Sequence, residues 1–246
     1  MSSASENTVT SGLAPETTVG ALVAAHPALA RLFEKLGIDY CCGGKQTLAA
    51  ACARKSLDGA LTVAAIEAVI EASAGQAPEV DAASMSLAQL ADHIEATHHA
   101  YLKVELPRLV EMADRVARKH AWRDARLPEL AETVQSLAAE MLAHMQKEEG
   151  VLFPLVRQIE SGARPGLPGS VLAGPIGQME AEHEAAGQLT TRARELSDGF
   201  TPDAESCNTH RALLAGLAEF EGDLHRHVHK ENNILFPRAL ALAAAR

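Results

Sequence analysis

The stretches HMQKEEGVLFP, residues 144–154, and HVHKENNILFP, residues 227–237, decide the fold of this chain. Each places a histidine four residues before a glutamate and continues to leucine, phenylalanine and proline. In an α-helix this spacing puts the imidazole and the carboxylate on one face, about one turn apart. Leu152 and Leu235 lie four residues beyond the glutamates, so the same faces are expected to continue into an apolar core.

A histidine–glutamate pair at this spacing has two interpretations. On a helix surface it is an ordinary side-chain pair that stabilises the helix by about a few tenths of a kcal/mol. In a core, a carboxylate stripped of water costs several kcal/mol unless a cation or several donors meet it. Because the pattern occurs twice, each time before the same three residues, we favour buried pairs that hold a metal.

Periodic apolar residues predict four long helices around these motifs, at about 86–118, 128–160, 172–196 and 204–243. Four such helices joined by modest loops are typical of a four-helix bundle, whose interior can carry a metal site. Prolines inside three of the ranges are expected to kink or loosen the helices: Pro107, Pro154 and Pro237. Aromatic residues make up 3%, which disfavours a β-sandwich or barrel, so the predicted fold class is all-α.

Composition divides the chain into four parts. Residues 1–18 are polar and are expected to form a disordered lead-in. Residues 19–75 predict a small helical domain, residues 76–84 a linker, and residues 85–246 the bundle.

The small domain contains two predicted helices. Leu29, Phe33 and Leu36 form an apolar stripe that Gly37 ends, and a second helix begins near Leu61.

Charge and cysteine content exclude several functional classes. The formal net charge is -10, so phosphate backbones and anionic lipids are expected to repel the chain. The N-terminus lacks the basic and apolar regions of a signal peptide, and no apolar run could span a bilayer. Four cysteines, two of them adjacent, are too few for a secreted disulfide scaffold. These features predict a cytoplasmic protein with neither nucleic-acid nor membrane partners.

The other two predicted helices supply further histidines. His183 is a candidate in the third, whereas the first offers His93, His98 and His99, and periodicity does not choose among them. One imidazole from each helix plus two carboxylates makes a set of four nitrogen and two carboxylate ligands without thiolate, which argues against structural zinc. Two bridging carboxylates and an oxo or hydroxo bridge would balance two ferrous ions and leave a vacant position for a small molecule.

These residues carry a resemblance to a known family. THHAYLKVELPRL around His99, the two repeated stretches, and EAEHEAAG around His183 resemble a hemerythrin-like di-iron bundle. The stretch GIDYCCGGKQTLAAACARK resembles the small ScdA_N-like domain that precedes such a bundle in the RIC family, proteins of the YtfE and ScdA type for repair of iron centres. The resemblance covers residues 19–242 and implies two irons held by six ligands: His99, His144, Glu148, His183, His227 and Glu231. It selects His99 over His98 and implies that both glutamates bridge.

Neighbours of these ligands also carry expectations. Glu149 and Glu182 adjoin ligands and are candidates to orient imidazoles. Cys41 and Cys42 are either two ordinary buried thiols or functional ones. Gly43 and Gly44 place them on a turn, and Lys45 could lower a thiol pKa, which predicts exposure and reactivity. The resemblance implies a functional loop that meets a client or handles iron.

The resemblance implies repair of iron–sulfur clusters damaged by nitric oxide or oxidants, through donation of iron to client proteins. Binding or reduction of nitric oxide at the centre would make the protein an enzyme as well. The alternative is a hemerythrin-like carrier or sensor of oxygen or nitric oxide, and a metal-free helical adaptor is a third hypothesis. A ferritin-like oxidase is disfavoured because its Glu-x-x-His spacing differs. A homodimer is left open.

Overall fold

The computed structural model describes residues 16–74, 81–163 and 170–245. The chain divides into two compact units, residues 1–80 and 81–246, which are described separately. Across the described residues the regular structure is helical, apart from an isolated antiparallel bridge between Thr18 and Thr47. The predicted all-α class is therefore confirmed.

The N-terminal unit is built from short helices, each begun or ended by a residue suited to that position. They are α1 (Val19–Ala25), α2 (Leu29–Leu36), α3 (Leu48–Arg54) and α4 (Gly59–Ser73). The side chains of Thr18, Thr47 and Asp58 accept hydrogen bonds from the first turns of α1, α3 and α4. Gly37 ends α2 at φ 65°, a left-handed conformation that glycine adopts without strain.

Thr18 corrects the expected start of the small domain. It was expected to lie in a polar lead-in, yet it caps α1, and the carbonyl oxygen of Thr17 accepts a hydrogen bond from the backbone N–H of Leu48. The remainder of the expected lead-in, residues 1–15, lies outside the described residues. The core of this unit gathers Val19, Leu29, Phe33, Tyr40 and Ile66 in full burial.

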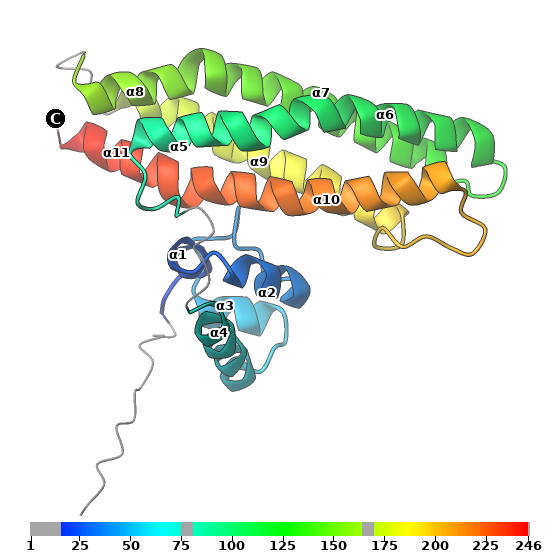
Figure 1. Ribbon diagram of the computed structural model, residues 1–246, viewed down its shortest axis with the longest axis horizontal. Coiled ribbons are helices and arrows are strands. Elements are labelled where there is room, and N and C mark those ends of the chain that lie inside the picture. Colours follow the sequence, from blue (N-terminus) through cyan, green and yellow to red (C-terminus); the bar gives the residue numbers. More distant parts are fainter. Residues whose placement is uncertain (1–15, 75–80, 164–169, 246) are drawn as a thin grey trace, which may run out of the picture. The chain divides into compact units, whose positions relative to one another are not determined.

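The second unit contains four long helical rods (Figure 1). Three of them are each interrupted by five π-helical residues. In chain order the rods are α5 (Leu87–Ile94), η1 (Glu95–His99) and α6 (Ala100–His120); α7 (Leu127–Lys147), η2 (Glu148–Leu152) and α8 (Phe153–Ser161); α9 (Ser170–Leu196); and α10 (Asn208–Lys230), η3 (Glu231–Leu235) and α11 (Phe236–Ala244).

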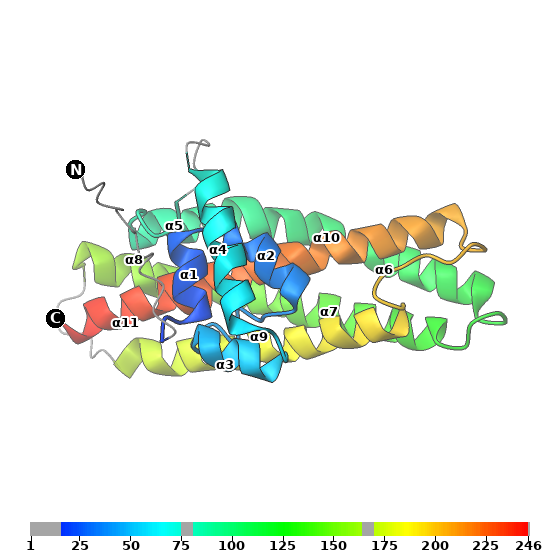
Figure 2. The ribbon, with the colours of Figure 1, turned by 90° about the horizontal axis from the view of Figure 1, so that it is seen from below.

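The rods lie side by side as a bundle, which Figures 1 and 2 show from two directions. The helix α6 packs against α7 and α10, and α9 packs against α7. Leucine, isoleucine, valine and phenylalanine side chains from the four rods fill the interior, including Leu106, Leu137, Ile176 and Phe220. The four-helix bundle is thus the scaffold of any site between the rods.

The rod ends and breaks follow local sequence. Ser86 and Gln89 form a reciprocal capping box at the start of α5. The fourth rod begins at Asn208, later than the expected residue 204, because the side chain of Ser206 accepts a hydrogen bond from the backbone N–H of Asp203 in a turn. Pro154 and Pro237 are the second residues after η2 and η3, so the expected loosening of these two rods takes the form of a π turn.

None of the helices in the described ranges combines the length and apolar character that crossing a membrane requires.

Candidate metal centre

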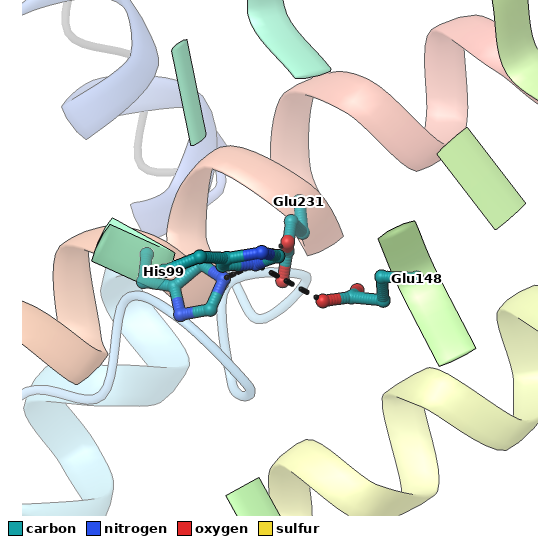
Figure 3. A group of neighbouring side chains, drawn as sticks. His99, Glu148 and Glu231 are labelled. Carbon is teal, nitrogen blue, oxygen red and sulfur yellow. Dashed lines mark hydrogen bonds and ion pairs between the residues drawn. The ribbon is translucent and has the colours of Figure 1, made fainter. Parts of the chain in front are cut away.

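Six side chains from the four rods meet in the middle of the bundle. His99 ends η1, His144 lies in α7, and His183 lies in α9. His227 lies in α10, and Glu148 and Glu231 begin η2 and η3. Figure 3 shows the side chains of His99, Glu148 and Glu231 directed toward one another. All six are buried, with exposed fractions of at most 1%.

The carboxylates stand between the imidazoles. The Glu148 Oε2 atom lies 3.3 Å from Nε2 of His99 and 3.2 Å from Nε2 of His144. The oxygens of Glu231 lie 3.0 Å from Nε2 of His227 and 3.1 Å from Nε2 of His183. Each carboxylate therefore contacts two imidazoles, one on each side of the cluster.

The cluster offers two places for a cation. One group consists of His99, His227, Glu148 and Glu231, and the other of His144, His183 and the same two glutamates. Within each group, one ligand atom from each residue lies within 4.8 Å of all the others. Two imidazoles and two shared carboxylates per group form a nitrogen and oxygen donor set that suits iron among other divalent metals.

Unsatisfied oxygens test whether a cation fits these groups. Both oxygens of Glu148 and Oε2 of Glu231 are buried and have no hydrogen bond to any residue that the structure describes, although imidazoles lie close to them. One proton could join the Nε2 atoms of His144 and His183, which are 3.0 Å apart, but it would leave those oxygens unbonded. Buried anionic oxygens need compensating positive charge. The donor set and the unbonded oxygens fit metal cations.

The pKa values of the buried groups also indicate that the carboxylates need positive charge beside them. Burial and the charge of Glu231 raise the pKa of the Glu148 carboxyl, but His144 and His99 outweigh them, and the net pKa is lowered. Burial also raises the pKa of Glu231, and His227 and His183 bring it well below its usual range. Burial lowers the pKa of His144, yet Glu148 raises it to a net value of about 9. The carboxylates are thus held charged only by positive charge beside them.

Three of the imidazoles are oriented through their outer nitrogens. Nδ1 of His99 lies 2.8 Å from Glu149, and Nδ1 of His144 lies 2.9 Å from Glu182, in agreement with the predicted orienting role of these glutamates. Asn232 Oδ1, at 2.9 Å, does the same for His183. Asn232 was not among the predicted site residues, although its place directly after Glu231 was a signal.

The phenylalanines of the repeated stretches support the same rings. Phe153 stacks on His99 at 5.7 Å between ring centroids, and Phe236 stacks on His183 at 6.1 Å. Each repeat therefore supplies a histidine, a glutamate and an aromatic wall for an imidazole of another rod. The recurrence of Leu-Phe-Pro was the sequence signal that pointed to this role of the phenylalanines.

Comparison with known proteins agrees with this geometry. Residues 90–239 match the Hemerythrin HHE cation binding domain family, and residues 15–70 match ScdA_N, a domain of unknown function. The iron-sulfur cluster repair proteins YtfE of Citrobacter koseri and Escherichia coli O157:H7 are each 42% identical over 223 residues, 91% of this chain and 96% of theirs. The chain belongs to the YtfE family. The YtfE protein of an Enterobacter strain is 41% identical over the same share of both chains.

His98 has a different environment from its neighbour in this YtfE-family chain. Both residues are buried, but of the two only His99 contacts the carboxylate of Glu148 in the centre. Nδ1 of His98 lies 2.9 Å from Asp223, and its Nε2 lies 2.8 Å from Nζ of Lys230. Burial lowers the pKa of His98 to about 4, against the opposing effect of Asp223. Periodicity could not separate the two histidines because both lie within η1.

The cysteines of the N-terminal unit correct another expectation. The predicted exposure is wrong for Cys41, which is 7% exposed. Its backbone N–H and its thiol donate to Oδ1 of Asp39, at 3.0 and 3.2 Å. A hydrogen bond with Cys42 and burial raise the pKa of Cys41 well above its usual value, opposite to the effect expected from Lys45. Cys42 is half-buried and remains the accessible member of the pair.

Proposed function

We propose that this protein repairs iron–sulfur clusters damaged by nitric oxide or oxidants by donating iron that the bundle holds. His99, His144, His183 and His227 would hold two iron ions, with Glu148 and Glu231 shared between them. Membership of the YtfE family supports the repair function, and the paired His/Glu groups support the number of ions. Bound iron would supply the material that a damaged cluster has lost.

The observation that carries this proposal is the composition of the two groups. Each offers two imidazoles and two shared carboxylates. Soft thiolate ligands are the ones that suit iron–sulfur clusters, so a site with nitrogen and oxygen donors competes poorly with a client's cysteines for iron. Such a site can hold iron in transit and still lose it to a cluster under assembly.

The surrounding residues control how the imidazoles are presented. With a metal bound, Glu149 and Glu182 would hold the protons of His99 and His144 at Nδ1, which would leave each Nε2 free to bind the metal. Lys103 donates to both oxygens of Glu149, and Lys147 donates to Glu182. The glutamate side chains are 27% and 22% exposed, so solvent reaches these supports while the imidazoles stay dry.

Transfer of iron to an apo-cluster protein tests the proposal. Protein prepared without oxygen is expected to contain about two iron ions per chain. Reduction should weaken the hold of the hard carboxylates, so iron should pass to the acceptor faster from the reduced than from the oxidised protein. Equal rates from both forms would contradict gated donation, and an iron-free, stable bundle would contradict the metal centre itself.

Cys41 and Cys42 are proposed as functional thiols for contact with the client or its iron. The half-buried Cys42 is the better candidate because Cys41 is held protonated by its surroundings. Cys42→Ala should slow transfer to an apo-cluster protein while the iron content stays at the wild-type level. Cys52→Ala is the matched control, since Cys52 is buried in the core of the same unit.

The hemerythrin match favours a second candidate, a carrier or sensor of oxygen or nitric oxide, with reduction of nitric oxide as a related activity. This function uses the same imidazoles and carboxylates but has no need of the cysteines. Unchanged gas binding in Cys41→Ala/Cys42→Ala protein, with no transfer of iron to an apo-cluster protein from either form, would favour it over thiol-assisted donation.

A further inference from the structure

The four imidazoles of the centre differ in how their outer nitrogens are held. Acceptors lie at 2.8 Å from Nδ1 of His99, at 2.9 Å from Nδ1 of His144 and at 2.9 Å from Nδ1 of His183. Two of these acceptors are carboxylates and the third is an amide oxygen. An acceptor at this position fixes the ring and its tautomer, and it raises the basicity of the nitrogen that faces the metal.

His227 is the exception. Its Nδ1 is buried, and within the part of the chain that the structure describes no group accepts a hydrogen bond from it. The ring is held by stacking on His98, with centroids 5.3 Å apart and planes at 8°. Stacking restrains the plane of the ring but leaves the basicity of its Nε2 without the support of an acceptor.

His98, the ring that stacks on His227, lies between an ammonium and a carboxylate. Nζ of Lys230 lies 2.8 Å from Nε2 of His98 and 3.0 Å from Nε2 of His93, so the ammonium donates to two neutral rings. The other nitrogen of His98, Nδ1, lies 2.9 Å from Oδ1 of Asp223. The charges of Lys230 and Asp223 offset each other, so the His98 ring restrains His227 by stacking and provides no acceptor for its Nδ1.

We propose that the two cation positions are unequal and that the His99/His227 position gives up its metal first. The His144/His183 position would be the retained one, because both of its imidazoles have acceptors. Loss of such an acceptor typically weakens metal binding by about 10- to 100-fold, which sets the expected difference between the positions. This inference rests on the proposed two-metal centre and adds the order in which iron leaves it.

Metal release to a chelator tests the order directly. Protein loaded with ferrous iron without oxygen should lose it in two phases of equal amplitude, with rates at least about 10-fold apart. Crystals of half-depleted protein should show anomalous scattering at the His144/His183 position. Residual scattering at the His99/His227 position, or shared equally between both, would overturn the proposal.

Two substitutions of Asn232 change the retained position in opposite directions. Asn232→Leu removes the acceptor of His183 at similar volume and should accelerate the slow phase by about 10-fold or more. Asn232→Asp replaces the amide with a carboxylate and should slow that phase further. The fast phase should stay within about 2-fold in both variants, well below the effect of losing an acceptor, and it serves as the internal control. A change confined to the fast phase would contradict the assignment.

The number of release phases and the number of metals bound distinguish failure of this inference from failure of the proposed iron donation. Two metals that leave in a single phase would overturn the unequal positions and leave iron donation standing. Failure to bind two metals at all would remove the proposed centre itself. Helical circular dichroism of each variant establishes that the bundle is formed, and Asn232→Asp keeps the comparison open if Asn232→Leu does not fold.

Discussion

Glu148 has no exposed surface, and among the described residues nothing donates a hydrogen bond to either of its carboxylate oxygens, yet it lies between imidazoles of both cation positions. Such a residue is costly to bury, so its presence is explained by what it binds rather than by the stability of the bundle. The apolar interior on either side, formed by residues such as Leu106 and Leu137, holds the helices together without it.

Glu148→Leu should therefore separate metal binding from folding. The variant is expected to lose at least half of its metal, because both positions share this carboxylate, while its helices remain formed. Metal analysis and far-ultraviolet circular dichroism measure the two effects. Glu140→Leu is a control on the exposed face of α7. Full metal content in Glu148→Leu protein would show that the carboxylate is not a ligand.

Tyr101 gives a prediction for alkaline pH. Its hydroxyl is buried and has no hydrogen-bond partner in the described parts of the chain, and burial, followed by the charge of Glu105, raises its pKa to about 12. Because the folded protein holds this proton more tightly than the unfolded chain does, stability should fall as the pH rises from about 10 toward 12. Alkaline absorbance titration should show a tyrosine ionising near 12. Tyr101→Phe should abolish that transition and the associated loss of stability.

At the scale of elements, the π turns determine where the ligands stand. Glu148 and Glu231 begin η2 and η3, and His99 ends η1. Proline has no N–H, so Pro154 cannot give the α-helical hydrogen bond to the carbonyl of Gly150, and a wider turn precedes it. Such turns are frequent at functional sites because they change the direction of side chains within a helix.

Pro154→Ala should restore α-helical bonding and disturb the site. Metal affinity is expected to fall by about 10-fold as Glu148 turns away from its imidazoles. Stability of the metal-free protein should rise by about 1 kcal/mol or more, since proline is a poor helix former. Pro107→Ala is the matched control, because Pro107 lies inside α6, whereas Pro154 is the second residue after a π segment. An equal loss of affinity in both variants would argue against a role for the π turn.

At the scale of the molecule, the chain is two compact units with separate interiors. The N-terminal unit has its own apolar core around Phe33 and Ile66, and the bundle provides all six side chains of the candidate centre. Metal binding and contact with a client can therefore reside in different units.

A fragment of residues 81–246 should fold and bind as much metal as the full chain. If the thiols of the N-terminal unit serve the client, the fragment should transfer iron to an apo-cluster protein more slowly. Metal analysis and transfer kinetics measure both effects, and full-length Cys42→Ala is the comparison for transfer. A fragment that loses its metal would show that the bundle depends on the N-terminal unit.

Local sequence rules were sufficient to place most elements. Ser86, Gly37 and the two repeated stretches begin, end or align helices through interactions within a few residues, so the sequence predicted those features correctly. The spacing of four between His144 and Glu148 likewise required only helical geometry to bring them within contact. The family resemblance selected His99, which reasoning from periodicity had left open.

Tertiary structure decided the features that depend on partners distant in the chain. The π turn at η1 set His98 and His99 in different surroundings, and Asp223 and Lys230 of another rod hold His98. A hydrogen bond with the next residue, Cys42, and burial reversed the expected effect on the pKa of Cys41, and the burial follows from packing rather than from the nearby charge of Lys45. The sequence by itself determined which residues could bind a metal. Only the packing of the rods determined which nitrogens are supported, because hydrogen bonds between helices depend on the final position of every side chain.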